Sequence, residues 1–460
     1  MHQEHESRAQ RKSAVPTVSR VCDDGSLIEL IYDPEKRSTA FSVFKNGTCT
    51  IESDLELHSG ERIAPFSPEN NLIKNEVVLL PSQPLEYGSP ADLMEEIQAF
   101  IHRYADLSPS FEKVAAYYVS LTWLYDAFNE MPYLRLRGDF GTGKTRTLLT
   151  IGSLCYKAFF ASGASTVSPI FHILNIFGGT LVFDEADFRF SDERAEIIKV
   201  LNNGNVKGIP VLRTMINRQR EFNPQAFHVF GPKIVATRGN YEDKGLESRF
   251  ITEEMSPRKL RADIPINLPL SFKSEARALR NRLLLYRFRH RIDAKIDESL
   301  LNPDLEPRLN QILMPLLSVV RDETVQKEMK AVAANAQARL IGERGDTVES
   351  HILEMLSELM VSSERPAVPI GAVTVAVVER YGHDYTRTIT NRWIGGIIRK
   401  RLGLQTYKSH GIYVVPRGEY EKIKILCQRY GIEPQEQWAT PLAKPGLGGH
   451  GDEESSKHAM

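Results

Sequence analysis

Alternating apolar and polar residues mark the first part of the chain. The segments LIELIYD, STAFSVFKNG and TCTIESD follow a period of two, and Asn46-Gly47 separates the last two of them. Such alternation predicts half-buried strands, and Asn-Gly between two strands predicts a tight hairpin. We therefore expect a small β-rich module over residues 21–85. Residues 1–20 are polar and are expected to form a disordered tail.

A helical period replaces this alternation after residue 85. Ser89 and Pro90 have the residue types of a helix N-cap and first turn, and Asp92 completes a capping-box pattern. Apolar residues then recur three and four positions apart, as on one helix face: Leu93, Ile97, Phe100, Ile101 and Tyr104. A second apolar helix is expected at about 111–128. Residues 86–130 are therefore predicted to be a helical lead-in.

Strand and helix patterns alternate over residues 131–266, which is typical of a parallel α/β domain. Residues 267–345 show helical patterns only. Residues 346–432 predict three helices, a β-hairpin and a last helix, in that order. The Gly-rich and charged residues 433–460 are expected to form a flexible tail.

Composition narrows the function classes only slightly. The formal net charge is -1, so any surface that binds nucleic acid must be local. The four cysteines lie far apart and form no CxxC pair, which argues against a zinc site or a disulfide framework. No signal-like segment begins the chain, and no run of about 18 apolar residues occurs in it. We expect a cytoplasmic protein without a membrane partner.

The strongest motif in the chain, G-x-x-x-x-G-K-[ST], runs in full from Gly138 to Thr145. A predicted strand (133–137) precedes it and a predicted helix (144–157) follows. Glycines let backbone N–H groups converge on phosphates, and the helix N-terminus adds a positive end. Lys144 is expected to contact the β- and γ-phosphates, and Thr145 to bind Mg²⁺. The predicted nucleotide-binding residues are Gly138, Asp139, Phe140, Gly141, Thr142, Gly143, Lys144, Thr145 and Arg146.

Two carboxylates follow a second predicted buried strand, TLVF, as Asp184 and Glu185. In parallel α/β sheets, ligands bind at the carboxyl ends of the strands. Asp184 is therefore predicted to hold Mg²⁺, and Glu185 to orient and deprotonate the attacking water. A helix N-cap with a solvated neighbour is the alternative for this pair.

A third buried strand, PKIVAT, ends at Thr237, with Arg238 and Asn240 behind it. A polar residue at this place is expected to point at the γ-phosphate as a sensor, and Thr237 is our candidate. A threonine that merely ends a strand is the alternative.

Together, the motifs GDFGTGKT, LVFDEAD, KIVAT and LESRF resemble those of AAA+ ATPases. The similarity is to the branch near minichromosome-maintenance helicases and the helicase-like ATPases of phages and plasmids. It implies an α/β P-loop NTPase core over 131–266, a parallel sheet sandwiched by helices, followed by a helical lid subdomain over 267–345. It also implies ATP and Mg²⁺ as cofactors and a homo-oligomer, a hexameric ring.

The same resemblance implies roles for two arginines. A Ser-Arg-Phe motif carries the arginine finger in minichromosome-maintenance helicases, and here Arg249 holds that position. Arg249 is therefore expected to reach the ATP of a neighbouring subunit, although Ile251 stands where Asp is usual. A surface ion pair is the alternative for Arg249. Arg280, in the predicted helix 271–291, is expected to act as sensor 2, and a solvated basic helix face explains it equally well.

A predicted hairpin before the sensor strand is the first candidate for DNA contact. Its basic residues could meet a phosphate backbone in a central channel, and they are Arg213, Arg218 and Arg220. An ordinary exposed hairpin is the alternative.

The C-terminal helices and hairpin resemble a winged helix, and they are the second candidate for DNA contact. No Asp or Glu occurs between Arg387 and Lys408, which favours a face that binds phosphate. The expected contacts are Arg387, Thr390, Asn391, Arg392, Arg399, Lys400 and Lys408. A winged helix that binds protein is the alternative.

The sequence thus predicts an ATP-hydrolysing motor that acts on DNA. A ring-forming helicase or translocase, linked to replication or mobile-element maintenance, is the leading hypothesis. An ATP-dependent DNA-binding switch or loader without unwinding activity is the second, and a protein-remodelling ATPase is the third. The predicted catalytic residues are Lys144, Glu185, Arg249 and Thr237.

Overall fold

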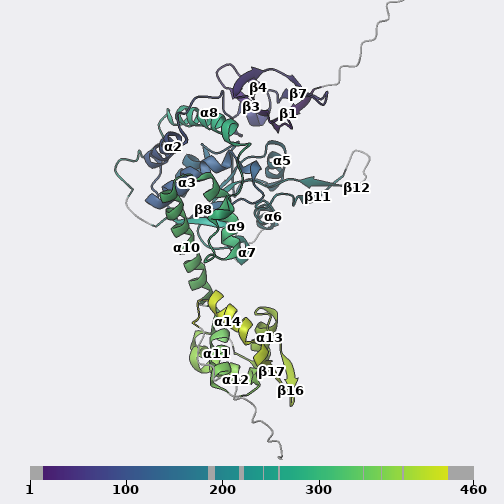
Figure 1. Cartoon of the computed structure of the whole chain (residues 1–460), viewed down its shortest axis with the longest axis vertical. Helices are drawn as coiled ribbons and strands as arrows, with labels where there is room; N and C mark the ends of the chain where they lie inside the picture. Colours follow the sequence, from purple (N-terminus) through teal and green to yellow (C-terminus); the bar gives the residue numbers. More distant parts are fainter. Residues whose placement is uncertain are drawn as a thin grey trace, which may run out of the picture. The chain divides into compact units, whose positions relative to one another are not determined.

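The computed structural model of the chain describes residues 14–184, 192–216, 222–241, 243–256, 260–345, 347–363, 365–385 and 388–433. The chain divides into two compact units, Met1–Gln337 and Ala338–Met460, whose elements are labelled in Figure 1.

The first unit begins with a β module of two small sheets. The larger sheet is antiparallel, with the order β2-β3-β4-β5, formed by Ser19–Val21, Leu27–Asp33, Ser38–Lys45 and Thr48–Glu52. The smaller has the order β1-β7-β6, formed by Val15–Thr17, Arg62–Pro65 and Leu55–Glu56. The predicted Asn46-Gly47 hairpin is confirmed, because these residues connect β4 to β5 with φ angles of 52° and 80°.

The module begins earlier than the predicted boundary at residue 21. Strands β1 and β2 both lie partly or wholly within the segment that was expected to be disordered. Val15 of β1 pairs in parallel with Ile63 of β7, and β2 pairs with β3. Both strands are three residues long, which is too short for an alternating pattern to predict them. They exist as strands because they pair with β7 and β3.

Helices lead from the β module into the core. After α1 (Asn71–Lys74) come α2 (Pro90–Tyr104), α3 (Pro109–Thr122) and the 3-10 turn η1 (Tyr125–Ala127). The predicted capping box is confirmed, since the Ser89 hydroxyl accepts from the Asp92 N–H and the Asp92 carboxylate accepts from the Ser89 N–H at 2.9 Å. Helix α3 ends well before the predicted end at residue 128.

A five-stranded parallel sheet forms the centre of the first unit. Its order is β14-β8-β13-β10-β9, formed by Phe250–Glu254, Tyr133–Arg137, Lys233–Thr237, Leu181–Asp184 and Phe159–Ser162. Between these strands run α4 (Lys144–Gly152), α5 (Val167–Phe177), α6 (Asp192–Asn203) and α7 (Lys244–Glu247). An antiparallel hairpin, β11 (Val211–Ile216) and β12 (Phe222–Phe227), extends from this core in Figure 1.

Helices cover both faces of the sheet. Leu134, Leu136 and Ala236 pack in one hydrophobic cluster with residues of α2, α3, α4 and α8. Tyr133 and Val235, which alternate with them along the strands, pack in a second cluster with residues of α5 and α6. The predicted fold class, a parallel sheet sandwiched by helices, is confirmed.

The predicted helical region follows the sheet. It contains α8 (Phe272–His290), the 3-10 turn η2 (Glu298–Leu300), α9 (Pro307–Val319) and α10 (Glu323–Gly345). The boundary between the two units falls within α10.

A buried cluster of charged side chains joins the β module to the core and to α8. Glu29 of β3 lies 2.7 Å from Arg287 Nε of α8 and 3.0 Å from Lys157 Nζ, and it accepts from the Tyr156 hydroxyl at 2.8 Å. Arg287 also pairs with Asp126, at 2.8 Å between Nη1 and Oδ1. Glu29, Lys157 and Arg287 are all buried, so three parts of the first unit share one ionic network.

The second unit contains the helices and hairpin expected over residues 346–432. Its helices are α11 (Val348–Ser362), α12 (Ile370–Tyr381), α13 (Asn391–Lys400) and α14 (Tyr420–Arg429), with 3-10 turns η3 (Gly382–Asp384) and η4 (Arg417–Glu419). A three-stranded antiparallel sheet has the order β15-β17-β16, formed by Ala367–Pro369, Ile412–Pro416 and Tyr407–Ser409. Strand β15 was not predicted, because its three residues run directly into α12.

Candidate nucleotide-binding site

The P-loop lies between the carboxyl end of β8 and the amino end of α4. Gly141 and Gly143 have φ angles of 73° and 85°, in the left-handed region that side chains disfavour. At Gly138 the requirement for glycine is steric instead, since a Cβ atom there would lie 2.3 Å from the Met255 carbonyl oxygen. Its N–H donates to the Thr237 carbonyl oxygen at 3.1 Å. The glycines at these three positions therefore allow the loop to curl over the start of α4.

Two side chains at the start of α4 have the partners expected of a phosphate and metal site. Lys144 Nζ donates to the carbonyl oxygens of Gly138 and Asp139, both at 2.6 Å. The Thr145 hydroxyl donates to Asp184 Oδ2 at 2.7 Å. The structure therefore brings together the P-loop lysine, the P-loop threonine and the strand-end aspartate, as the sequence predicted.

The chemistry of this pair fits Mg²⁺. Hydroxyl and carboxylate oxygens are hard ligands, and Mg²⁺ is usually held by one or two protein oxygens together with phosphates and water. Among the described residues, no group of three or more His, Cys, Asp and Glu side chains could form an all-protein metal site. Thr145 and Asp184 are the two side chains here that could serve as ligands of such an ion.

A pocket of about 350 Å³ surrounds these groups. Arg238, which follows β13, lies in it with its guanidinium carbon 3.5 Å from the centroid of the Phe140 ring. Phe140 is 71% exposed at the tip of the P-loop. Arg146, also in the lining, donates to the Pro265 carbonyl oxygen at 2.5 Å. The pocket is thus lined by three basic residues and one carboxylate, which suits a polyphosphate.

The sensor role expected of Thr237 stays a prediction. Ala236 and Arg238 line the pocket, and side chains alternate along a strand, so Thr237 points to the opposite face of the sheet. Its hydroxyl is buried and has no hydrogen-bond partner among the described residues. Arg238, which directly follows this strand, lines the pocket.

The structure places Arg280 away from the position expected of sensor 2. Its side chain is buried in α8 and donates to the Ser153 carbonyl oxygen at 2.6 Å. Ser153 is the C-cap of α4, at the opposite end of that helix from Lys144. Burial lowers the pKa of Arg280 to about 10. Arg280 therefore closes the far end of the P-loop helix and does not face the pocket.

Arg249 lies at the other end of the sheet from the P-loop. Its carbonyl oxygen accepts from the N–H of Tyr133, the first residue of β8, whereas Gly138 follows the last. A strand of this length spans roughly 17 Å. The Arg249 guanidinium donates to Asn202 Oδ1, and its Nε has no partner among the described residues. Arg249 therefore points away from the phosphate site of its own chain.

A buried ion pair fixes the segment that carries Arg249. Glu247 of α7 accepts from Arg135 Nη1 at 2.6 Å and from Nη2 at 2.7 Å, with both side chains buried. Arg135 lies on β8, the strand that leads into the P-loop. The pair thus joins the segment that carries Arg249 directly to the strand that precedes the P-loop. Sequence patterns gave no signal for it, because the two residues are far apart in the chain.

A second arginine, which the sequence analysis missed, lies near Arg249. Burial lowers the pKa of Arg249, and the positive charge of Arg308 lowers it further. Arg308 belongs to the first turn of α9. Two guanidinium groups therefore lie close together at the end of the sheet that is opposite the P-loop.

The β11–β12 hairpin, which precedes β13, contributes one basic residue whose side chain the structure describes. Arg213 Nη2 lies 2.5 Å from Glu196 Oε2 of α6, and the guanidinium carbon lies 4.3 Å from the centroid of the Phe171 ring. Arg213 is therefore engaged within the core. Arg218 and Arg220 of the hairpin, the predicted base Glu185 and the predicted DNA contact Arg387 lie outside the described residues.

The remaining candidates for DNA contact lie around α13. Arg392, Arg399, Lys400 and Lys408 are exposed, as is Asn391. The Thr390 hydroxyl caps α13 by accepting from the Trp393 N–H at 3.3 Å, so its first role is structural.

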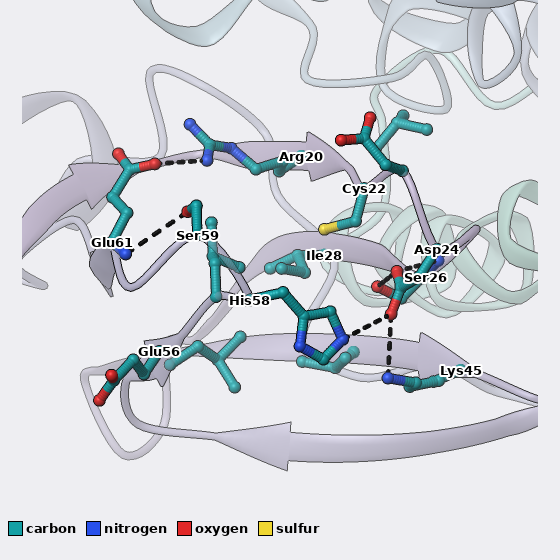
Figure 2. Close-up of a pocket in the computed structure, with 15 residues that line it drawn as sticks. Arg20, Cys22, Asp24, Ser26, Ile28, Lys45, Glu56, His58, Ser59 and Glu61 are labelled. Atoms are coloured by element: carbon teal, nitrogen blue, oxygen red, sulfur yellow. Dashed lines mark hydrogen bonds and ion pairs between the residues drawn. The ribbon is translucent and has the colours of Figure 1, made fainter.

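A second hollow, of about 570 Å³, lies in the β module and is drawn in Figure 2. Ile28, Val43 and Leu55 contribute apolar walls. Its basic side chains already face carboxylates: Arg20 lies 2.7 Å from Glu61, and Lys45 and His58 lie 2.9 and 3.3 Å from Asp24. The hollow is therefore a poorer match to a polyphosphate than the P-loop pocket.

No protein-family model matches the chain, and no curated protein matches it. Several solved structures are similar. The C-terminal region of NrS-1 is 13% identical with a TM-score of 0.35, over 85% of this chain and 96% of that one. A full-length MCM homolog from Methanopyrus kandleri is 11% identical with a TM-score of 0.36, over 65% of this chain and 67% of that one. SCCmec type IV Cch, an active helicase, is 10% identical with a TM-score of 0.33, over 89% of this chain and 94% of that one.

These TM-scores are all below 0.5, so the assignment of the nucleotide site rests on the geometry of this chain. In the part of the chain that the structure describes, no helix has both the length and the apolar character needed to span a lipid bilayer.

Proposed function

We propose that this chain is an ATP-hydrolysing, Mg²⁺-dependent motor that acts on DNA as a ring-forming helicase or translocase. One observation carries the ATPase part: Thr145 and Asp184 meet at 2.7 Å beside Lys144, under a glycine-rich loop at the carboxyl end of a parallel sheet. That arrangement suits a triphosphate with its metal ion.

Each residue of the site has its own proposed role in binding or hydrolysing the nucleotide. Lys144 would exchange its two loop carbonyls for the β- and γ-phosphates, whose charge makes them the stronger acceptors. Thr145 and Asp184 would hold Mg²⁺, which neutralises phosphate charge when bound. Glu185 is proposed to orient and deprotonate the attacking water. Arg238 would leave the Phe140 ring and sense the γ-phosphate, in the role first expected of Thr237.

A second protomer would complete each site. Arg249 is about one strand length from its own P-loop, so it can act on a nucleotide only if that nucleotide is bound by a neighbour. A guanidinium suits the spread of negative charge over the γ-phosphoryl group in the transition state. Such a contact is heterologous, and heterologous contacts form a ring when the rotation between neighbouring subunits closes. The proposed assembly is a hexamer, with Arg308 as a second cation at each seam.

DNA would be held by the second unit. The exposed side of α13 and the adjoining hairpin carry basic residues, and no Asp or Glu occurs from Thr388 to Gly418. A basic helix of this kind fits the major groove and its phosphates.

One observation favours a second candidate, an ATP-dependent DNA-binding switch or loader. A translocase needs basic groups that face the strand, yet Arg213 of the β11–β12 hairpin is engaged with Glu196. A switch needs no such contact, because it only assembles on DNA and does not move along it.

The experiment measures ATP hydrolysis with and without single- and double-stranded DNA, and then strand displacement on a forked duplex. A motor is expected to hydrolyse faster with DNA and to displace the strand. Lys144→Ala should abolish hydrolysis, and Lys36→Ala, an exposed change in the β module, should not alter it. Stimulation without displacement would leave the switch, and full turnover by Lys144→Ala would refute the proposed site.

A further inference from the structure

One face of the hairpin in the second unit differs from the other. Tyr407 pairs with Val414 and Lys408 pairs with Tyr413 across β16 and β17. Directly opposed residues in an antiparallel pair point to the same side, and successive residues alternate. Tyr413 and Lys408 therefore share one face. Tyr407 shares the other with Val414, which is buried.

Helix α13 continues the face that carries Tyr413. The Arg399 guanidinium carbon lies 5.2 Å from the centroid of the Tyr413 ring, and Figure 1 shows the hairpin beside α13. Arg392 lies seven positions before Arg399, two helical turns away and on the same side of the helix. We call this set the basic–aromatic face: Arg392, Arg399, Lys408 and Tyr413.

The Tyr413 ring is placed to accept a planar partner. Arg399 covers one side of the ring at cation–π distance, and the residue is still 51% exposed. About half of the residue is therefore accessible to a partner. Tyr407 is exposed to a similar extent, 46%, but its cross-strand neighbour is a buried valine and not a lysine.

The charge of the face indicates the chemistry of the partner. Its three cations are exposed, and the segment from Thr388 to Gly418 contains no acidic residue. A phosphate backbone matches such a surface, and an aromatic ring beside it matches an unstacked base. Bases inside a continuous duplex are already stacked on one another, so they offer no face to Tyr413.

We propose that the basic–aromatic face binds DNA at a junction where duplex gives way to single strand. Arg392 and Arg399 contact phosphates of the duplex arm, and Tyr413 stacks on the first unpaired base. This inference rests on the proposed function, in that DNA is the substrate, and it adds the class of DNA structure that the second unit recognises.

The test compares binding of the full chain to a forked duplex, a blunt duplex and a single strand, by fluorescence anisotropy at one fixed salt concentration. Loss of one base-stacking contact weakens binding by between about 5-fold and about 140-fold. Tyr413→Ala should show this loss on the fork and none on the blunt duplex. Tyr413→Phe keeps the ring and should bind as the unaltered chain does. Arg392→Ala should weaken binding to fork and duplex alike.

Tyr407→Ala is the matched control, because it removes the same side chain from the same hairpin at similar exposure. It should leave binding to the fork unchanged. A 2-aminopurine at the first unpaired position should lose fluorescence when the unaltered chain binds, and should keep it with Tyr413→Ala. Both variants change exposed residues, and thermal unfolding of each checks that the unit is folded.

The inference is overturned if Tyr413→Ala and Tyr407→Ala bind the forked duplex with equal affinity. It is also overturned if the unaltered chain binds the forked duplex no more tightly than the blunt duplex. In either case DNA binding itself persists and the proposed function stands. A chain that binds no DNA of any form removes the proposed function as well.

Discussion

At Gly138, the backbone of β8 passes so close to Met255 that only a hydrogen atom fits. A Cβ atom added at residue 138 would lie 2.3 Å from the carbonyl oxygen of Met255 and 2.9 Å from the Cβ atom of Met255. The contact is with backbone, so it cannot be relieved by rotating a side chain. Gly138 is therefore required by packing, whereas Gly141 and Gly143 are required by their positive φ angles.

Gly138→Ala is expected to weaken ATP binding. Overpacking at such a contact costs about 1–3 kcal/mol, and the shift would displace the carbonyl oxygen that Lys144 now contacts. ATP titration by fluorescence or calorimetry measures the effect. Gly342→Ala is the control, since a Cβ atom there has nothing within 4 Å and alanine favours the helix. Wild-type affinity in the Gly138 variant would show that the loop does not depend on this contact.

Single residues also show where sequence analysis succeeds. Lys144, Thr145 and Asp184 were found because their motifs are local and chemically specific. The side to which Thr237 points could not be predicted, because the sequence does not say which face of a strand carries its last side chain. Arg280 was misjudged because helical spacing shows which residues share a face but not what that face packs against. Glu247 and Arg308 left no local signal, since their partners come from distant segments.

Between elements, the buried ionic network around Glu29 connects β3, the segment between α4 and β9, and α8. Arg287 is its centre, because it pairs with both Glu29 and Asp126. It also donates to the Trp123 carbonyl oxygen at 2.6 Å. The β module is therefore tied to the core by charge as well as by apolar packing.

Arg287→Met is expected to destabilise the first unit strongly. Removing one partner of a buried ion pair costs about 3–5 kcal/mol, because the opposite charge stays buried and uncompensated. Arg289→Met is the matched control. It also removes a bidentate arginine–carboxylate pair from α8, but the pair with Glu86 is exposed, so solvent screens it and its loss should change the stability little. Urea denaturation followed by circular dichroism gives both free energies. Equal losses in the two variants would contradict the role of burial.

Asp126 gives this network a dependence on pH. Burial alone would raise the pKa of Asp126, but Arg287 and Arg291 lower it well below 3.8. The unfolded chain therefore binds the proton first as the pH falls, and the stabilisation from this carboxylate is lost below about pH 4. Asp126→Asn should be less stable than wild type at pH 7, and the difference should shrink towards pH 3. A difference in unfolding free energy that stays constant over this range would rule out the carboxylate as its source.

Over the whole molecule, most of the element order could be predicted from the sequence. Periodicity located the strands and helices of the core, and local caps and turns such as Ser89 and Asn46-Gly47 were confirmed. Strands β1, β2 and β15 could not be predicted, because each is three residues long and exists only through pairing with other segments. The proposed ring depends on contacts between chains, which sequence patterns within one chain do not show. Arg249 is the residue in the sequence on which the prediction of a ring rests.

The seam between protomers is the central claim, and a mixing experiment tests it most directly. Lys144→Ala and Arg249→Ala are each expected to lack ATP hydrolysis when assayed alone. When the two are mixed, some seams combine an intact P-loop from one variant with an intact finger from the other. Random heterologous assembly makes about a quarter of the seams complete, so part of the wild-type rate should return. Wild-type turnover by Arg249→Ala alone, or a mixture as inactive as its components, would contradict the account.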